Sequence, residues 1–143
     1  MKTLKIMLPI LIGVFLFMSL LPYGKRENPQ SDPKLALQAP ENVQKIFKRS
    51  CYDCHSNHTK WPWYSYVFPL SWSVMDDVKN GRRALNFDEW KKYDTQKQAE
   101  LKDAIAHKSG VTMPLKAYLW FHKDAKLSKE DIQTIQKWAY SNE

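Results

Sequence analysis

Apolar residues fill the chain almost without interruption over residues 6–22, and Lys2 and Lys5 precede them. Positive residues before an apolar stretch are typical of an export signal, and about 17 residues is the short end of the range that spans a membrane. No small-residue cleavage pattern follows Leu21. We therefore expect residues 1–26 to be an uncleaved, single-pass anchor; a cleaved signal peptide is the alternative.

After residue 40, apolar side chains recur three and four positions apart, as on one face of a helix, and no segment alternates as a strand would. The first such face consists of Val43, Ile46 and Phe47. A second helix is predicted to begin at Ser71 as its N-cap and to end near Gly81. The pattern indicates an all-α domain over residues 41–143.

Two further helices have recognisable ends. Asp94 or Thr95 is predicted to cap a helix that runs to about Lys108 and is stopped by Gly110. Ser128 followed three residues later by an aspartate forms a capping-box pattern. The helix it opens places four apolar side chains on one stripe: Ile132, Ile135, Trp138 and Ala139. Asn86 or Asp88 is expected to start a short turn around Trp90.

Prolines mark two irregular segments. Residues 27–40 hold Pro29, Pro33 and Pro40 among polar side chains, which predicts a tether between the membrane and the domain. Residues 61–69 are aromatic and twice interrupted by proline, which predicts an irregular packed loop.

The strongest chemical motif is Cys51-Tyr52-Asp53-Cys54-His55, the pattern C-x-x-C-H of c-type haem attachment. Two thiols one helical turn apart can add to the two haem vinyl groups as thioethers. The adjacent His55 then supplies an imidazole nitrogen to the iron. The motif predicts one covalently attached haem c.

Other uses of these cysteines fit less well. A redox-active pair needs a βαβ setting that the pattern does not show. A structural zinc site needs four ligands at ordered spacing, and His55 is too close to Cys54 for that. A plain disulfide between Cys51 and Cys54 remains an alternative in an oxidising compartment.

The second axial ligand is predicted to be Met113, which is followed by proline and lies near the end of a predicted helix. A thioether ligand on a proline-stiffened loop is typical of haem c electron carriers, and Met/His ligation raises the reduction potential. Met75 lies on the apolar stripe of its own helix and is interpreted as core. Of the other histidines, His122 is the reserve ligand, ahead of His58 and His107.

Composition modifies this picture in two ways. Beyond Arg26 the chain holds 18 basic and 15 acidic residues, so most of the net charge of +7 belongs to the N-terminal segment, and no basic stripe predicts nucleic-acid binding. The aromatic content of 13% suits the walls of a haem pocket. The candidates for those walls are Trp61, Trp63, Tyr64, Trp72, Trp90, Tyr118 and Trp120. Arg82 and Arg83 are interpreted as solvated surface, with pairing to haem propionates as the alternative.

With these residues the chain resembles the bacterial haem-binding domain family, small proteins with one C-x-x-C-H and an N-terminal membrane segment. The resemblance runs from about Asn42 to Trp138. Its motifs are Cys51-Tyr-Asp-Cys-His-Ser-Asn, Trp61-Pro-Trp-Tyr-Ser, Pro69-Leu-Ser-Trp, Gly81-Arg-Arg-Ala-Leu-Asn-Phe-Asp-Glu-Trp, Met113-Pro-Leu-Lys-Ala-Tyr and Ala125-Lys-Leu-Ser-Lys-Glu-Asp-Ile. The resemblance implies a cytochrome c-like helical domain with His55 and Met113 as axial ligands.

The function expected from these features is one-electron transfer on the periplasmic side of the cytoplasmic membrane, by a carrier that is not an enzyme. The sequence does not identify its redox partners. An enzyme or gas sensor with an open sixth position is one alternative, and an accessory haem module of a larger oxidoreductase is another.

Overall fold

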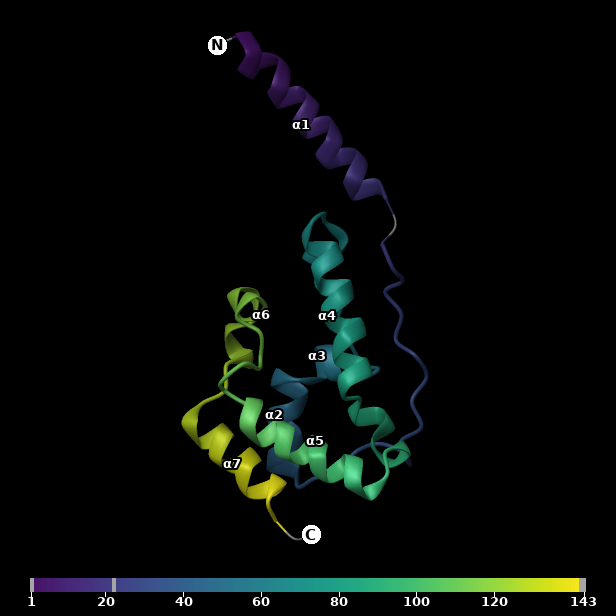
Figure 1. Ribbon diagram of the computed structural model, residues 1–143, viewed down its shortest axis with the longest axis vertical. Coiled ribbons are helices and arrows are strands. Elements are labelled where there is room, and N and C mark those ends of the chain that lie inside the picture. The colour runs from purple at the N-terminus through teal and green to yellow at the C-terminus, as the bar shows by residue number, and fades with distance from the viewer. Residues whose placement is uncertain (1, 22, 142–143) are drawn as a thin grey trace.

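Helices are the only regular elements in the described residues. The computed structural model describes residues 2–21 and 23–141, and within them it contains no strand, which confirms the all-α prediction (Figure 1). In chain order the elements are α1 (Lys2–Leu20), α2 (Glu41–Ser50), α3 (Tyr52–His55), η1 (Trp63–Tyr66), α4 (Leu70–Ala84), η2 (Phe87–Lys92), α5 (Thr95–Lys108), α6 (Lys116–Phe121), η3 (Lys123–Ala125) and α7 (Lys129–Ala139).

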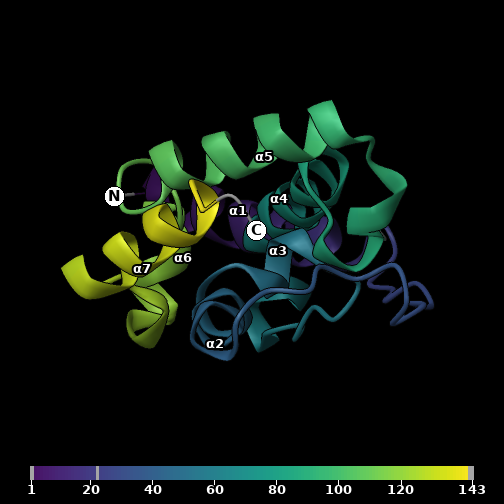
Figure 2. The ribbon, with the colours of Figure 1, turned by 90° about the horizontal axis from the view of Figure 1, so that it is seen from below.

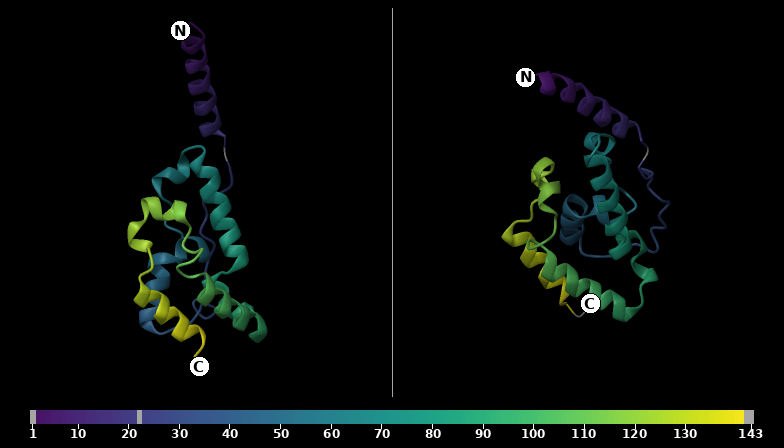
Figure 3. Two further views of the ribbon diagram at one scale, coloured as in Figure 1. Left: turned by 60° about the vertical axis from the view of Figure 1, so that its left-hand side comes forward. Right: turned by 45° about the horizontal axis from the view of Figure 1, so that its top comes forward.

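The N-terminal helix α1 projects from the end of the domain at which α4 begins (Figure 3). Its segment Thr3–Leu20 is long and apolar enough to cross a membrane, and none of that segment is buried. A signal sequence would show the same properties, so the helix agrees with either predicted role of residues 1–26. Pro22, the last residue of the predicted apolar run, lies outside the described residues.

The core lies where α2, α5 and α7 meet, and α5 and α7 run side by side there (Figure 2). The predicted faces of these helices point into it, because Val43, Ile46 and Phe47 of α2 and Ile135 and Trp138 of α7 are all buried. Rings stack at its centre. The Phe47 and Phe87 centroids are 4.8 Å apart, and Trp138 meets Phe47 edge-on at 5.3 Å.

Most predicted helix ends are confirmed. The side chain of Asn86 accepts from the N–H of Asp88 at the start of η2, and that of Asp94 accepts from the N–H of Lys97 at the start of α5. Ser128 and Asp131 form the capping box of α7. Each cap satisfies an N–H that has no partner within its helix.

The predicted ends of the α4 helix are wrong. The helix begins at Leu70, so Ser71 lies inside its first turn and makes no cap. It also continues through Gly81 to Ala84. Gly81 does not stop the helix because its φ is not positive; its missing side chain has another role, at the site described below.

The proline-rich segment 27–40 lies against the domain along much of its length. The N–H of Leu37 donates to the carbonyl of Phe87 at 2.8 Å, and the N–H of Lys91 donates to that of Leu35 at 2.9 Å. The Leu37 side chain is buried in the core. The segment therefore connects α1 to α2 and also covers part of the domain.

Candidate functional site

The structure brings the four predicted site residues to one cavity. Cys51, Cys54, His55 and Met113 all line a space of about 480 Å³ between α3, α4, α5 and α6. This is the size of a small-molecule or cofactor site. Most of the lining is apolar, and it includes Val74, Val78, Leu101, Ile105 and Leu115.

The two cysteines lie where α2 gives way to α3. Cys51 ends α2, with its N–H donating to the carbonyl of Phe47, and the carbonyl of Cys51 accepts from the N–H of His55 at 3.0 Å. No disulfide joins the two sulfurs. Burial raises the pKa of each thiol to about 12. This is the opposite of the lowered pKa that is typical of a redox-active thiol pair.

The imidazole of His55 is held from behind by the backbone of α4. Its Nδ1 atom lies 3.0 Å from the carbonyl oxygen of Gly81 and 3.1 Å from that of Leu85. Carbonyl oxygens only accept, so Nδ1 carries the proton and Nε2 presents a lone pair. Burial lowers the pKa of His55, which favours the neutral form that ligates a metal. Histidine ligands are commonly oriented by such a bond from the other ring nitrogen.

Gly81 permits this arrangement. A Cβ at Gly81 would overlap the carbonyl oxygen of Cys54, so α3 and α4 approach each other as closely as they do only because position 81 has no side chain. The backbone contact sets the distance between the attachment motif and the carbonyls that hold His55.

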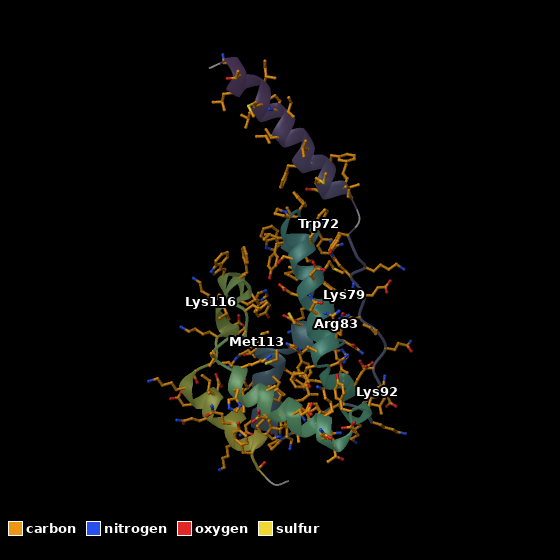
Figure 4. The ribbon with its side chains drawn as sticks, viewed as in Figure 1. Trp72, Lys79, Arg83, Lys92, Met113 and Lys116 are labelled. Atoms are coloured by element: carbon orange, nitrogen blue, oxygen red, sulfur yellow. The ribbon has the colours of Figure 1, made fainter. Side chains whose placement is uncertain are left out.

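Met113 is fixed by a tight loop at the end of α5. The N–H of Met113 donates to the carbonyl of Lys108 at 3.0 Å, and the N–H of Gly110 donates back to the carbonyl of Met113 at 2.8 Å. Gly110 takes a φ of 77°, as the predicted helix stop requires. Figure 4 places Met113 between α6 and α4, at the middle of the domain. The main chain at Met113 is thus positioned by hydrogen bonds on both sides.

The predicted aromatic wall is formed in part. Tyr64, Tyr118 and Trp120 line the cavity, together with Phe121, which the sequence analysis did not single out. The other candidates, Trp61, Trp63, Trp72 and Trp90, are not part of its lining. The hydroxyl of Tyr118 donates to Asp53 at 2.7 Å, and burial together with this carboxylate raises the tyrosine's pKa.

The other histidines have different partners. His122 is hydrogen-bonded through Nε2 to the hydroxyl of Tyr64 at 2.8 Å and stacks on Tyr118 at 4.2 Å, and it does not line the cavity. His58 is largely exposed and lies 3.6 Å from Asp88. His107 contacts Asp103 on the outer face of α5. Met75 is buried and lies away from the cavity, as expected of a core residue.

The interpretation of Arg82 as solvated surface is wrong. Its guanidinium donates to the carbonyl of Ser56 at 2.8 Å, to that of Glu27 at 2.9 Å and to the side chains of Asn28 and Thr59. It thereby joins the loop after α3 to the proline-rich segment. The sequence does not distinguish Arg82 from the neighbouring Arg83, which is exposed and bonds Asn80 of its own helix.

Three charged side chains that the sequence pattern did not place lie at the cavity, two lysines and Asp77. Lys60 and Lys108 line it, whereas Arg82 and Arg83 do not. Lys108 is the last residue of α5, and its place next to the Met113 loop could have been predicted from the end of that helix. Lys60 stands in an irregular segment that no periodicity places. Both ammonium groups suit an anionic edge of a bound cofactor.

The donor sets exclude a structural zinc site in the described part of the chain. No group of three or more His, Cys, Asp or Glu side chains there lies close enough to hold a metal ion, whereas such a site takes four ligands. One imidazole, one thioether and two buried thiols around an apolar cavity fit a haem bound through C-x-x-C-H.

Comparison with known proteins agrees with this chemistry. A family model described as "Haem-binding domain" matches residues 13–141. The match begins inside α1 and includes the proline-rich segment, so it extends beyond the motifs noted from the sequence. No curated protein and no solved structure matches the chain.

Proposed function

Since the chain belongs to the haem-binding domain family and therefore binds haem, we propose that it holds one haem c for one-electron transfer. Cys51 and Cys54 would hold the group as thioethers, and His55 and Met113 would ligate its iron. The bound haem supplies an iron that alternates between the ferric and ferrous states.

The observation that carries this proposal is the orientation of His55. The N–H of its Nδ1 donates to the carbonyls of Gly81, on α4, and of Leu85, the residue that follows α4. Nε2 is left for the cavity that the two cysteines and Met113 also line. A backbone-oriented imidazole of this kind keeps its position in either oxidation state, which keeps reorganisation small.

The other residues that line the cavity are mostly apolar and would exclude water from the iron. The apolar side chains of α4 and α5 keep the dielectric low, which with a methionine ligand favours the ferrous state. If Met113 ligates the iron as proposed, no position would be left open there for peroxide or a gas. This supports a carrier over an enzyme or a sensor.

The proposed location is the outer face of the cytoplasmic membrane, with α1 as the anchor. Support comes from the length and apolar character of Thr3–Leu20 and from Lys2 and Lys5 at the N-terminal end of α1. Attachment of haem to C-x-x-C-H takes place outside the cytoplasm, so the anchor and the motif agree.

The test is to produce the full chain with a c-type maturation system, purify it from membranes, and extract it with acidified acetone. We expect the haem to stay with the protein, the intact mass to exceed that of the polypeptide by one haem, and the protein to cycle reversibly between two oxidation states at an electrode. Cys54→Ala should leave a single thioether. His107→Ala, on the outer face of α5, is the control and should retain full attachment. Complete loss of haem to the solvent would contradict covalent binding, and rapid peroxide turnover would contradict the carrier.

A further inference from the structure

Exposed apolar residues of the domain gather at one end of it. Beyond residues 2–21, the exposed large apolar side chains of the described residues are Trp63, Tyr66, Leu70, Val111, Trp120, Phe121 and Tyr140. Five of them belong to η1, the start of α4, and α6, and we call these the aromatic rim: Trp63, Tyr66, Leu70, Trp120 and Phe121. Trp63 is 69% exposed and Trp120 is 74% exposed, which is unusual for side chains of this size.

The rim reaches the mouth of the cavity. The rings of Trp63 and Phe121 meet edge-on with centroids 6.4 Å apart, so η1 and α6 are in contact there. Leu70, Trp120 and Phe121 are exposed and also line the cavity. Side chains that face both solvent and the cavity mark its opening.

The same end of the domain is joined to α1. Phe15 of α1 packs edge-on against Phe68, just before α4, with centroids 6.1 Å apart. Tyr23 stacks on Trp72 at 4.8 Å, and its hydroxyl donates to Asp76 at 3.0 Å. Figure 4 shows Trp72 at the end of α4 nearest to α1. Phe15 is five residues from the end of α1, about 7.5 Å along its axis, so the segment that it touches lies at membrane depth if α1 spans a bilayer.

We propose that the aromatic rim inserts into the interface of the same membrane that α1 spans, so that the cavity opens toward lipid. This rests on the proposed anchoring. Tryptophan and tyrosine prefer the headgroup level of a bilayer because their rings are apolar and their N–H or O–H is polar. Positive charge adjoins the rim, since the guanidinium of Arg26 lies 4.4 Å from the centre of the Tyr66 ring and Lys25 precedes it. Such charges suit lipid phosphates.

Hydroxyl-radical footprinting of the haem-loaded full chain in phospholipid nanodiscs tests the proposal. The oxidation rate of each residue is read by mass spectrometry and divided by its rate in the denatured chain. Trp63 and Trp120 should be oxidised several-fold more slowly than Tyr140, which is exposed at the opposite end of the domain. Rim residues that are oxidised as fast as Tyr140 while α1 is protected would overturn the proposal and leave the anchor intact. An unprotected α1 would overturn both.

Two further outcomes separate lipid from protein occupants. Protection of Trp120 that grows with the number of chains per disc would indicate a second copy of the chain, and protection that needs an added redox protein would indicate a protein partner; either result overturns membrane insertion. The variant Trp63→Ser with Tyr66→Ser removes two rim residues that do not line the cavity. In nanodiscs it should raise the oxidation of Trp120 several-fold, whereas Tyr140→Ser should not change it.

Discussion

The imidazole of His55 donates its Nδ1 proton to the carbonyl oxygen of Gly81, 3.0 Å away, on the helix against which the attachment motif packs. A Cβ on Gly81 would also overlap the carbonyl oxygen of Cys54. One residue of α4 thus orients the proposed iron ligand and sets the spacing of the helix that carries it. Because the acceptor is a backbone atom, only a change in helix spacing can remove it.

Gly81→Ala should therefore impair the site. Alanine favours helix by about 1 kcal/mol over glycine, but its Cβ would overlap the Cys54 carbonyl, and overpacking costs about 1–3 kcal/mol. We expect a lower free energy of unfolding and a smaller fraction of chains with covalent haem, measured by denaturant titration and by the pyridine haemochrome spectrum. The control is Lys79→Ala, an exposed position of the same helix. A Gly81→Ala protein as stable as this control would show that the close approach does not matter.

Arg82→Lys should destabilise the domain although it keeps the charge. Lysine lacks the planar fork that lets one arginine bond Ser56, Glu27 and Asn28 together. Hydrogen bonds to a charged group contribute about 1.5–3 kcal/mol, and we expect a loss in that range. Proteolytic cleavage within residues 27–40 should accelerate, because the proline-rich segment loses its attachment.

Arg83→Lys is the matched control for that change. Arg83 is exposed and bonds Asn80 of its own helix, so its replacement should alter stability by about 0.5 kcal/mol or less. Equal effects of the two substitutions would refute the role assigned to Arg82.

Periodicity and capping chemistry were sufficient to predict the amphipathic helices, which have one solvent-exposed and one buried face. The α2 and α7 stripes and the caps at Asn86, Asp94 and Ser128 follow from local rules, and the structure confirms them. The ends of α4 were missed because local rules treat Ser71 as a cap and Gly81 as a stop. A glycine is required at position 81 because the backbone there packs closely against α3, which lies far away in sequence.

The candidate site divides in the same way. The motif predicted Cys51, Cys54 and His55, and the helix end predicted the position of Met113 beside them. The second partner of the His55 imidazole, the Arg82 bonds and the cavity face of Phe121 depend on how segments meet across the fold. No pattern in a single segment encodes such contacts.

Stability should depend on pH through Asp131. Burial would raise the pKa of this carboxyl, but it lies below its usual value because the N–H of Ser128 and the guanidinium of Arg49 donate to it, Arg49 at 2.6 Å. A lowered folded pKa means that the contribution is present above the unfolded value of about 3.9 and is lost as pH falls through the folded value. Asp131→Asn should thus cost about 1 kcal/mol or less at neutral pH, through loss of the negative charge, because the amide oxygen can still accept from Ser128 and Arg49 is partly exposed and screened.

The difference between wild type and Asp131→Asn should shrink as the pH falls through the folded pKa, because the wild-type carboxyl then becomes neutral as well. Denaturant titrations at a series of pH values measure it. Asp124→Asn, at an exposed aspartate, should show no comparable change. A difference that stays constant down to strongly acidic pH would mean that the charge of Asp131 does not contribute.

Met113→Ala should change the haem without detaching it. If Met113 is the sixth ligand, the weak charge-transfer band of ferric thioether-ligated haem at the red edge of the visible spectrum disappears in the variant. The reduction potential falls, because Met/His ligation raises it, and carbon monoxide and cyanide gain access to the iron. Met75→Ala is the matched control. Met75 is buried away from the cavity, so its truncation should cost about 2–5 kcal/mol of stability and leave the band in place.

The state of the iron in Met113→Ala also tests the reserve ligand. His122 is held by the Tyr64 hydroxyl at 2.8 Å and stacked on Tyr118 at 4.2 Å, so it would have to give up both contacts to reach the cavity. We therefore expect the variant to be high-spin. A low-spin spectrum that becomes high-spin only when His122→Ala is added would show that the histidine moves in. A wild-type protein that is already high-spin and binds carbon monoxide readily would exclude Met113 as a ligand, and with it the main support for a carrier over a ligand-binding haem protein.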